Sequence, residues 1–347
     1  MISARTIQEI NDVTRIEEVI GDFVSLKKRG KSYLGLCPFH NERTPSFNVT
    51  PSKNLFKCFG CGKAGDSITF LREHENFNYV EALRWLAHRY NIKIEETEEN
   101  AEERERKQTE EGLYVITGFA QQYYSKQLFD TDEGKSIGLQ YFHERGYRDN
   151  LIEKFQLGFA QDRADDFFNE AKVNGYNEDL LREVGLIKDQ RGKTVDFFRG
   201  RVIFTIHNLS GKVVAFAGRY LKKQEGAPKY INSPQTTIYD KSRTLYGLFQ
   251  ARNAIRNHDE CFLVEGYTDV ISMHQAGIEN VVASSGTSLT QEQARLMKRF
   301  TPNITILYDG DFAGVKAALR GMNILLDEDL NVRLVLLPEG EDPDSYV

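Results

Sequence analysis

Residues 261–266 read Cys-Phe-Leu-Val-Glu-Gly, and this arrangement of a short apolar run ending in an acid recurs twice nearer the C-terminus. Residues 303–311 read Asn-Ile-Thr-Ile-Leu-Tyr-Asp-Gly-Asp, and residues 332–344 run from Val-Arg-Leu-Val-Leu-Leu to Glu-Asp-Pro-Asp. Apolar runs too short for helices are typical of strands buried on both faces of a sheet. Segments 289–300 and 314–326, which have helical spacing, alternate with these runs, so the order predicts a parallel sheet.

Carboxylates follow each of these predicted strands. Ligands of parallel sheets bind beyond the carboxyl ends of the strands, so Glu265, Asp309 and Asp311 are expected to lie close together. They would repel one another unless a hard cation joins them, and Mg²⁺ prefers oxygen ligands and phosphates. One or two such ions could activate an attacking oxygen and stabilise a leaving one in phosphoryl transfer. The alternative is that each acid belongs to a solvated Asp-Gly turn, which is common for one acid and less so for three.

The acidic pattern also carries a resemblance. Residues 265–269, Glu-Gly-Tyr-Thr-Asp, together with Asp-Gly-Asp at 309–311 and Asp-Pro-Asp at 342–344, resemble the signature of the Toprim fold. That fold is shared by bacterial primases, some topoisomerases and some nucleases, and the resemblance implies a metal-dependent nucleic-acid domain. Glu265, Asp309 and Asp311 are then the expected catalytic residues and Mg²⁺ ligands, with Mn²⁺ as an alternative ion. Further candidate ligands are Asp269, Asp342 and Asp344.

A second constellation, of cysteine and histidine, lies near the N-terminus. Cys37 and His40 form a C-x2-H pair, and Cys58 and Cys61 form a C-x2-C pair seventeen residues later. Two close pairs on tight turns, brought together by a hairpin, offer four protein ligands and predict one closed structural zinc site. The fourth cysteine, Cys261, lies inside an apolar run and is expected in the core. Clustered cysteines of this kind indicate metal binding in a reducing compartment.

Length and composition are those of a globular protein with more than one domain. The 347 residues predict two or three domains, and a hydrophobic content of 40% is enough for their cores. The sequence has no apolar run of about 18 residues, so no membrane span is expected. The first residues lack an apolar signal core, so secretion is not implied and a cytoplasmic location is expected.

Charge is distributed unevenly along the chain, although the net value is −6. Residues 27–63 hold eight Lys and Arg against one Glu, and residues 199–243 hold nine against two acids. Such basic stretches can neutralise phosphates, with an ordinary solvated surface as the alternative. Aromatic residues interleaved with the first stretch could stack on unpaired bases. Phe39 and Phe59, beside the metal turns, are expected in the core instead.

Apolar spacing predicts the remaining elements. It indicates helices over 5–24 and 80–90 and a mostly helical region over 113–198, followed by a hairpin of strands 201–206 and 212–217. Residues 95–111 hold nine Glu and three basic residues, so they are predicted to form an exposed linker, with a helical spacer as the alternative.

Two segments punctuated by proline and glycine, 228–234 and 239–247, are predicted to be loops. Their Lys, Asn and Ser side chains suit phosphate and ribose contacts. Residues 285–288, Ser-Gly-Thr-Ser, precede a predicted helix and could hold a phosphate or merely cap that helix.

Together these features resemble bacterial DNA primase over the whole of residues 1–347. The zinc pattern is preceded by Tyr-Leu-Gly-Leu at 33–36 and followed by Lys-Ala-Gly-Asp-Ser at 63–67, as in the primase zinc-binding domain, and the segments 228–234 and 239–247 resemble the catalytic core. The resemblance implies a DNA-directed RNA polymerase, a nucleotidyltransferase that makes short RNA primers for replication. It also implies residues lining the nucleotide and template path: Arg145, Arg199, Arg201, Arg219, Lys229, Asn232 and Lys241.

The expected fold is multidomain, α+β and α/β, with an N-terminal zinc ribbon and then a mixed α/β catalytic core containing a Toprim-type parallel sheet. Expected boundaries are a zinc-binding domain at 1–95, an acidic linker at 96–112, a basic part of the polymerase core at 113–257 and a Toprim subdomain at 258–347. The family's core continues further and a helicase-binding domain follows it, so this chain is expected to be a monomeric fragment.

The resemblance implies single-stranded DNA template and ribonucleoside triphosphates as partners, and the replicative helicase through a domain absent here, at the bacterial replication fork. Two alternatives stay open. A topoisomerase or nuclease could share the acids, but it would need a tyrosine nucleophile or a further catalytic domain. A non-enzymatic DNA-repair clamp could also pair zinc with Toprim, but it would not need the basic loops over 219–241.

Overall fold

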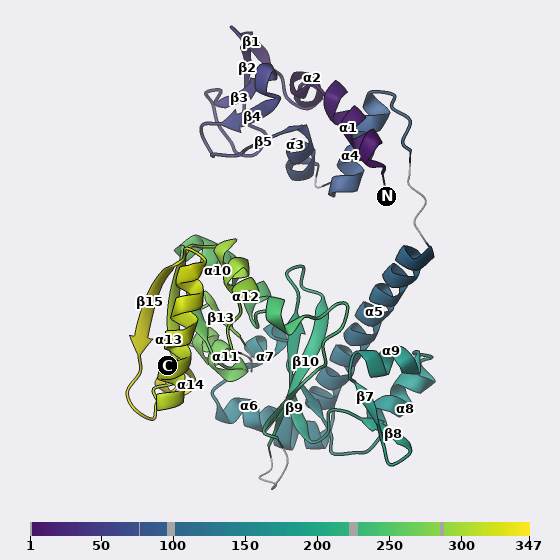
Figure 1. Cartoon of the computed structure of the whole chain (residues 1–347), viewed down its shortest axis with the longest axis vertical. Helices are drawn as coiled ribbons and strands as arrows, with labels where there is room; N and C mark the ends of the chain where they lie inside the picture. The colour runs from purple at the N-terminus through teal and green to yellow at the C-terminus, as the bar shows by residue number, and fades with distance from the viewer. Residues whose placement is uncertain (1, 76, 96–100, 222–227, 285–287) are drawn as a thin grey trace. The chain divides into compact units, whose positions relative to one another are not determined.

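The computed structural model describes residues 2–75, 77–95, 101–221, 228–284 and 288–347. The chain divides into two compact units, Met1–Arg104 and Glu105–Val347, and the boundary between them falls within the segment predicted as a linker. Figure 1 shows the elements of each unit. Among the described residues, no helix combines the length and the apolar character that a membrane span requires.

The first unit begins with two helices, α1 (Ala4–Val13) and α2 (Ile16–Gly21). The prediction of one helix over 5–24 was wrong, because the backbone is extended at Thr14 and Arg15. The Thr14 hydroxyl donates to the Ile10 carbonyl at 2.6 Å, and the Thr14 N–H donates to the same carbonyl at 3.0 Å, so Thr14 caps the end of α1. The break lets Ile10 and Ile16 enter two different cores.

A five-stranded antiparallel sheet carries the zinc pattern, and its strands follow chain order. The strands are β1 (Lys27–Arg29), β2 (Ser32–Gly35), β3 (Phe47–Thr50), β4 (Leu55–Cys58) and β5 (Ala64–Gly65), with the 3₁₀ turn η1 (Pro51–Lys53) between β3 and β4. Helices α3 (Ser67–His74) and α4 (Tyr79–Arg89) follow. Phe47, Phe56 and Phe70 are buried beneath the sheet, and Phe39 packs against them. Phe59 is 72% exposed, so its predicted place in the core was wrong.

The second unit begins with α5, a helix from Ala101 to Asp130 that spans both the end of the acidic segment and the next predicted helix. Short helical elements follow it: the π-helix η2 (Gly134–Leu139), α6 (Gln140–Glu144), α7 (Asp149–Lys154), α8 (Asp166–Val173) and α9 (Glu178–Glu183). A two-stranded hairpin, β7 (Ile187–Gln190) and β8 (Lys193–Asp196), then leads to the sheets. Leu113, Ile116 and Tyr124 are buried, so the part of α5 that follows the acidic segment belongs to the core of this unit.

An antiparallel sheet has the strand order β11-β10-β9-β6. Its strands are β6 (Gly158–Ala160), β9 (Arg201–His207), β10 (Val213–Tyr220) and β11 (Tyr230–Asn232). β11 lies where a loop was predicted, so that part of the prediction was wrong. The edge of β10 offers unpaired backbone groups, and Tyr230 and Asn232 align with Arg219 and Ala217 in antiparallel register. This pairing places the segment after Lys229 beside Arg219.

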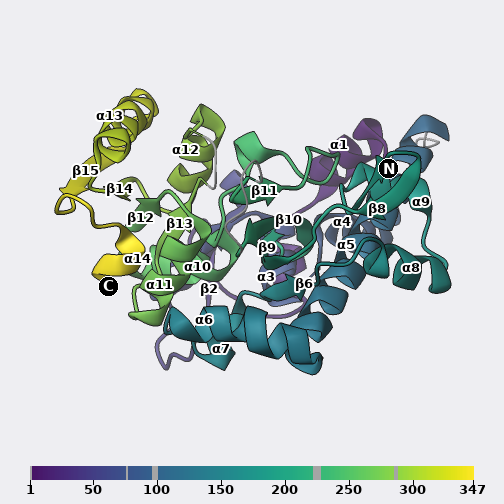
Figure 2. The ribbon, with the colours of Figure 1, turned by 90° about the horizontal axis from the view of Figure 1, so that it is seen from below.

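The second sheet is parallel throughout, in the order β13-β12-β14-β15. Its strands are β12 (Cys261–Val264), β13 (Val281–Ala283), β14 (Asn303–Tyr308) and β15 (Asn331–Leu336). The surrounding elements are η3 (Lys241–Arg243), α10 (Leu248–His258), α11 (Tyr267–Gln275), α12 (Gln291–Lys298), α13 (Phe312–Asp327) and α14 (Pro343–Tyr346). Figure 2 shows α12 and α13 on one side of this sheet and α11 and α14 on the other.

The parallel sheet is buried at its centre and exposed at one edge. Leu263 and Ile306 pack with α10, α12 and α13, while Val264 and Leu307 share a core with α11 and the antiparallel sheet. Cys261 is fully buried, as predicted. β15 is an edge strand with Leu336 65% exposed, so the prediction that it is buried on both faces was wrong. The expected order of a zinc ribbon and then a mixed α/β core with a parallel sheet is confirmed.

Candidate functional site

The four predicted zinc ligands converge at the ends of β2 and β4. Their candidate ligand atoms all lie within 4.8 Å of one another. The Sγ atoms of Cys37 and Cys61 are 3.8 Å apart, as are Sγ of Cys58 and Nδ1 of His40. Zinc–sulfur bonds of about 2.3 Å in a tetrahedron place two sulfur atoms about 3.8 Å apart, so this donor set fits zinc in both chemistry and spacing.

Glu42 is not itself a predicted ligand, but it contacts the turn that carries Cys37 and His40. Its Oε2 lies 3.3 Å from Nε2 of His40, and its Oε1 accepts the backbone N–H groups of Cys37 at 2.8 Å and Ser46 at 3.0 Å. A carboxylate on the far nitrogen of a ligating imidazole fixes the ring and its tautomer, here leaving Nδ1 for the metal. Glu42 was not among the residues predicted from the sequence; its only signal was an acid two residues past a candidate ligand.

The Cys58 thiol lies among hydrogen-bond donors. Burial opposes its ionisation, but the Ser46 hydroxyl at 3.3 Å and the backbone N–H groups of Cys61 and Gly60 favour the thiolate. Together these donors lower the pKa of Cys58 to about 6. Zinc binds thiolates, so this sulfur is prepared for the metal at neutral pH.

Gly60 should be the most sensitive small residue of the zinc turn. A Cβ at this position would lie 2.7 Å from Nε2 of His40 and 2.8 Å from Oγ of Ser46. We therefore expect Gly60→Ala to displace His40 and weaken zinc binding by about tenfold or more, the scale typical of changes next to a metal's ligands. Competition with a chromogenic chelator measures this. Gly21→Ala is the matched control, because a Cβ there has no atom within 4 Å; equal zinc affinity in the two variants would contradict the packing argument.

The predicted acids surround a cavity of about 620 Å³ in the second unit, at the carboxyl ends of β12 and β14. Five of the six candidates line it: Glu265, Asp269, Asp309, Asp342 and Asp344. Asp311 is not among the lining residues. It is exposed, and its Oδ1 caps α13 by accepting the N–H of Gly314 at 2.7 Å.

Several of the acids around the cavity have a raised pKa. Burial, and next the neighbouring Asp309, raise the pKa of Glu265 to about 7. Burial likewise raises the pKa of Asp269 to about 6, opposed by the Gly266 N–H at 2.8 Å, and it raises the pKa of Asp309. Within the described residues, Oε1 of Glu265 is buried without a hydrogen-bond partner. An unpartnered carboxylate oxygen beside other carboxylates suits a divalent cation better than any neutral group.

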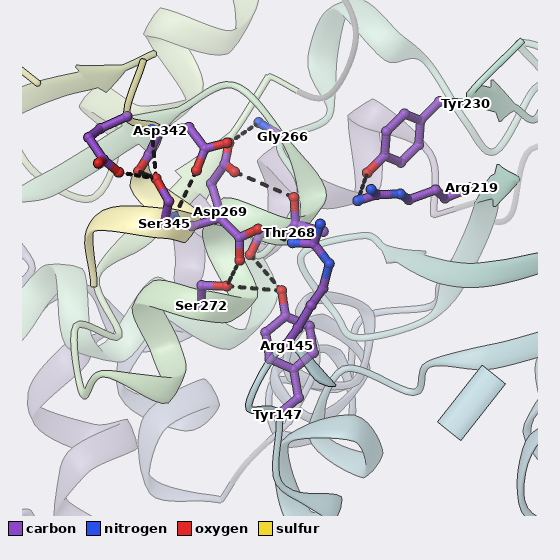
Figure 3. A network of polar contacts seen from close by, with 12 residues as sticks. Arg145, Tyr147, Arg219, Tyr230, Gly266, Thr268, Asp269, Ser272, Asp342 and Ser345 are labelled. Carbon is purple, nitrogen blue, oxygen red and sulfur yellow. Dashed lines mark hydrogen bonds and ion pairs between the residues drawn. The ribbon is translucent and has the colours of Figure 1, made fainter. Parts of the chain in front are cut away.

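Basic and amide side chains line the same cavity as these acids. Four of the seven predicted residues of this kind line it: Arg145, Arg219, Lys229 and Asn232. The guanidinium groups of Arg145 and Arg219 lie 5.2 and 5.1 Å from the ring centre of Tyr141. Arg219 also donates to the Tyr230 hydroxyl at 3.3 Å, and the Tyr267 hydroxyl donates to Oδ1 of Asn232 at 3.0 Å. Figure 3 shows Arg145 and Arg219 with their partners.

The other three predicted residues are not among those lining the cavity. Arg201 is buried, and its guanidinium donates to the carbonyls of Gly218 at 3.0 Å and Pro228 at 3.1 Å. Arg201 therefore links the backbone at Pro228, next to Lys229, to β10. Arg199 is half-buried before β9, and Lys241 begins η3, where its carbonyl accepts from the Gln293 side chain at 3.1 Å.

One face of α13 completes the cavity and was not predicted from the sequence. Its lining residues recur at helical spacing: Ala313, Ala317, Arg320, Gly321 and Ile324. Arg320 is the basic residue among them, and its positive charge lowers the pKa of Glu265, partly offsetting the effect of burial and of the neighbouring acids. The 3.6-residue period, counted from Ala313, was the signal that could have found it. Of the predicted turn over 285–288, Ser288 lines the cavity, while residues 285–287 lie outside the described part of the chain.

Family models match three successive parts of the sequence. Residues 2–102 match a CHC2 zinc finger, and residues 123–252 match the N-terminal domain of the DNA primase catalytic core. Residues 262–347 match a Toprim-like domain. These matches follow the zinc ribbon, the helical and antiparallel region, and the parallel sheet in turn.

Individual relatives agree with this order. A DNA primase of Halalkalibacterium halodurans is 44% identical over 348 residues, covering 100% of this chain and 57% of its own length. The chain thus spans little more than half of that relative. A crystal structure of the zinc-binding and RNA polymerase domains of Aquifex aeolicus primase superimposes with a TM-score of 0.64 at 36% identity, covering 98% of this chain and 81% of that one. A DnaG primase catalytic domain bound to single-stranded DNA gives a TM-score of 0.63 at 35% identity, covering 68% and 76%.

Proposed function

The chain belongs to the bacterial DNA primase family, and on that premise we propose that it is a DNA-directed RNA polymerase that begins short RNA primers on single-stranded DNA. The observation that carries the proposal is one cavity of about 620 Å³ that is lined both by acids and by Arg145, Arg219 and Lys229. Nucleotidyl transfer needs both, because a nucleoside triphosphate is a polyanion whose reacting phosphate must be neutralised and held in line.

The acids fit a catalytic cation. Glu265 and Asp309 would hold one or two Mg²⁺ ions, or Mn²⁺, with Asp269 and Asp342 close by; the unpartnered Oε1 of Glu265 supports this choice. Asp311, whose carboxylate caps α13, would contribute mainly through its charge. When bound, such an ion neutralises phosphate charge and lowers the pKa of an attacking 3′-hydroxyl.

The basic side would hold the triphosphate and the template. Arg219 is kept in place by the Tyr230 hydroxyl and the Tyr141 ring, so little side-chain freedom is lost when it meets a phosphate. The backbone of Lys229 is held by Arg201, whose guanidinium donates to the Lys229 carbonyl at 3.2 Å. Asn232, held by Tyr267, offers an amide for a ribose or a base.

The zinc unit would contact the template. Its metal is structural, and its basic stretch includes Lys57, whose Nζ lies 5.4 Å from the ring centre of the exposed Phe59. Exposed aromatic rings beside basic groups suit unpaired bases. For the whole protein we also propose the replicative helicase as a partner, at the replication fork in the cytoplasm, with no described residue assigned to that contact.

One assay separates the proposal from its alternatives. Single-stranded DNA, labelled ribonucleotides and Mg²⁺ are expected to yield short RNA in the presence of this chain. A topoisomerase or nuclease would relax or cut DNA instead, and a repair clamp would only bind it. The match of residues 123–252 to the DNA primase catalytic core favours the primase over both.

The raised pKa of Glu265 predicts a characteristic pH dependence. The fold moves this pKa from its ordinary 4.5 to about 7, so between these values the unfolded chain releases the proton first. Without divalent ions, the free energy of unfolding should therefore fall as pH rises from about 4.5 to 7. Mg²⁺ should restore stability at pH 8 and do little at pH 5. Thermal denaturation of the wild type and Glu265→Gln measures this; the same slope in both would contradict it.

A further inference from the structure

A chain of buried and half-buried polar contacts joins three segments beside the cavity. Asp344, in α14, is ion-paired with Arg145 through Oδ2 and accepts the Ser272 hydroxyl through Oδ1. The Ser272 and Tyr147 hydroxyls lie 2.9 Å apart. Because Ser272 donates its proton to Asp344, the single hydroxyl proton of Tyr147 is shared between Oγ of Ser272 and the Thr268 carbonyl, which lies 3.0 Å away in the first turn of α11 (Figure 3).

Burial makes these contacts specific. Tyr147 is 1% exposed and Ser272 is 6% exposed, so water cannot replace a lost partner there. A buried hydroxyl left unpaired carries its full desolvation cost, so the contacts of Tyr147 and Ser272 favour one arrangement of the network. The arrangement selected here is the docking of α14 against α11.

That docking sets the position of two groups at the cavity. Asp342 is the N-cap of α14, accepting the Ser345 N–H at 2.7 Å, and its charge raises the pKa of both Asp309 and Asp269. Arg145, at the C-terminal end of α6, lines the same cavity. Neither Tyr147 nor Ser272 lines it, so any effect of their hydroxyls on Asp309 and Asp269 passes through Asp344.

We propose that Tyr147 and Ser272 are positioning residues: their hydroxyls fix Asp344, and through it Asp342 and Arg145, and so set the affinity of the acidic site for its divalent cation. This inference rests on the proposed function. According to this proposal, the network contributes to cation affinity as well as to the stability of the fold.

Tyr147→Phe and Ser272→Ala test the proposal, because each removes one hydroxyl and leaves the packing in place. The Phe142 ring, 6.2 Å away between centres, would still stack on residue 147. We expect the Mg²⁺ concentration for half-maximal primer synthesis to rise about three- to tenfold in each, the effect of losing one buried hydrogen bond. The rate at saturating Mg²⁺ should stay within about twofold of wild type. The double variant should need no more Mg²⁺ than the single variant with the larger effect, because both substitutions interrupt the same network.

Binding of Mn²⁺ without nucleotide, followed by electron paramagnetic resonance, should weaken by the same factor and gives a measurement independent of activity. Tyr124→Phe is the matched control, because the Tyr124 hydroxyl is buried without a hydrogen-bond partner in the described structure. This variant should bind Mn²⁺ as wild type does.

The inference is overturned if wild type makes primers and both the Tyr147→Phe and the Ser272→Ala variants bind Mn²⁺ as wild type does. It is equally overturned if their rates fall by one factor at every Mg²⁺ concentration. A wild type that makes no primers yet shows the Mn²⁺ effect would overturn the proposed function and leave the inference standing.

Discussion

Asp309→Asn should reduce primer synthesis by about 10²- to 10³-fold or more, the scale of losing one charge-stabilising group in an active site. Asp309 follows β14 directly, is half-buried and raises the pKa of Glu265. An amide in its place keeps the shape and removes the charge that a divalent cation needs. Incorporation of labelled ribonucleotides on a single-stranded template measures the loss.

Binding of single-stranded DNA should survive the same change, because it would depend on the basic residues. Fluorescence anisotropy with a labelled oligonucleotide is expected to give the same affinity as wild type. Asp327→Asn, at the exposed end of α13, is the same substitution away from the cavity and should leave synthesis unchanged. A fully active Asp309→Asn protein would remove Asp309 from the proposed chemistry.

Cys58→Ser should release the zinc and unfold the five-stranded sheet of the first unit. Cys58 ends β4 and is fully buried, and its sulfur lies 3.8 Å from Nδ1 of His40. Structural zinc contributes about 10–16 kcal/mol of apparent binding free energy in small zinc-finger peptides, which exceeds what a sheet of this size supplies alone. Zinc content by atomic emission and limited proteolysis of the first unit measure the two effects.

Cys261 supplies the control for that experiment. It is a buried cysteine of β12, so Cys261→Ala should retain one equivalent of zinc. If Cys58→Ser also retained a full equivalent, the ligand assignment would be wrong.

Prediction from the sequence was most accurate where burial is nearly complete. The runs at 261–264 and 303–308 became β12 and β14 with those bounds, because a strand covered on both faces has to be apolar throughout. The zinc pattern was equally readable, since its ligands are paired locally and only the two pairs had to meet. β15 was misread because its sequence is as apolar as theirs, while its place at the edge leaves Leu336 exposed.

The features that escaped prediction depend on contacts between distant segments. β11 forms because β10 offers it an edge, and nothing within residues 230–232 shows this. Arg201 and Arg219 lie in neighbouring strands, yet one is buried against backbone carbonyls and the other lines the cavity. The link from Tyr147 to Ser272 spans 125 positions of sequence, so no local pattern could reveal it.

The central claim is that carboxylates at the carboxyl ends of β12 and β14 hold the divalent cation. Crystals soaked in Mn²⁺ and measured at its absorption edge test it most directly, because the anomalous signal locates the ion without assumption. We predict a peak at about 2.2 Å, a usual metal–carboxylate distance, from Oε1 of Glu265 and from a carboxylate oxygen of Asp309. An ordered Mn²⁺ site that touches neither residue, or a cavity that stays empty at millimolar Mn²⁺, would contradict the account.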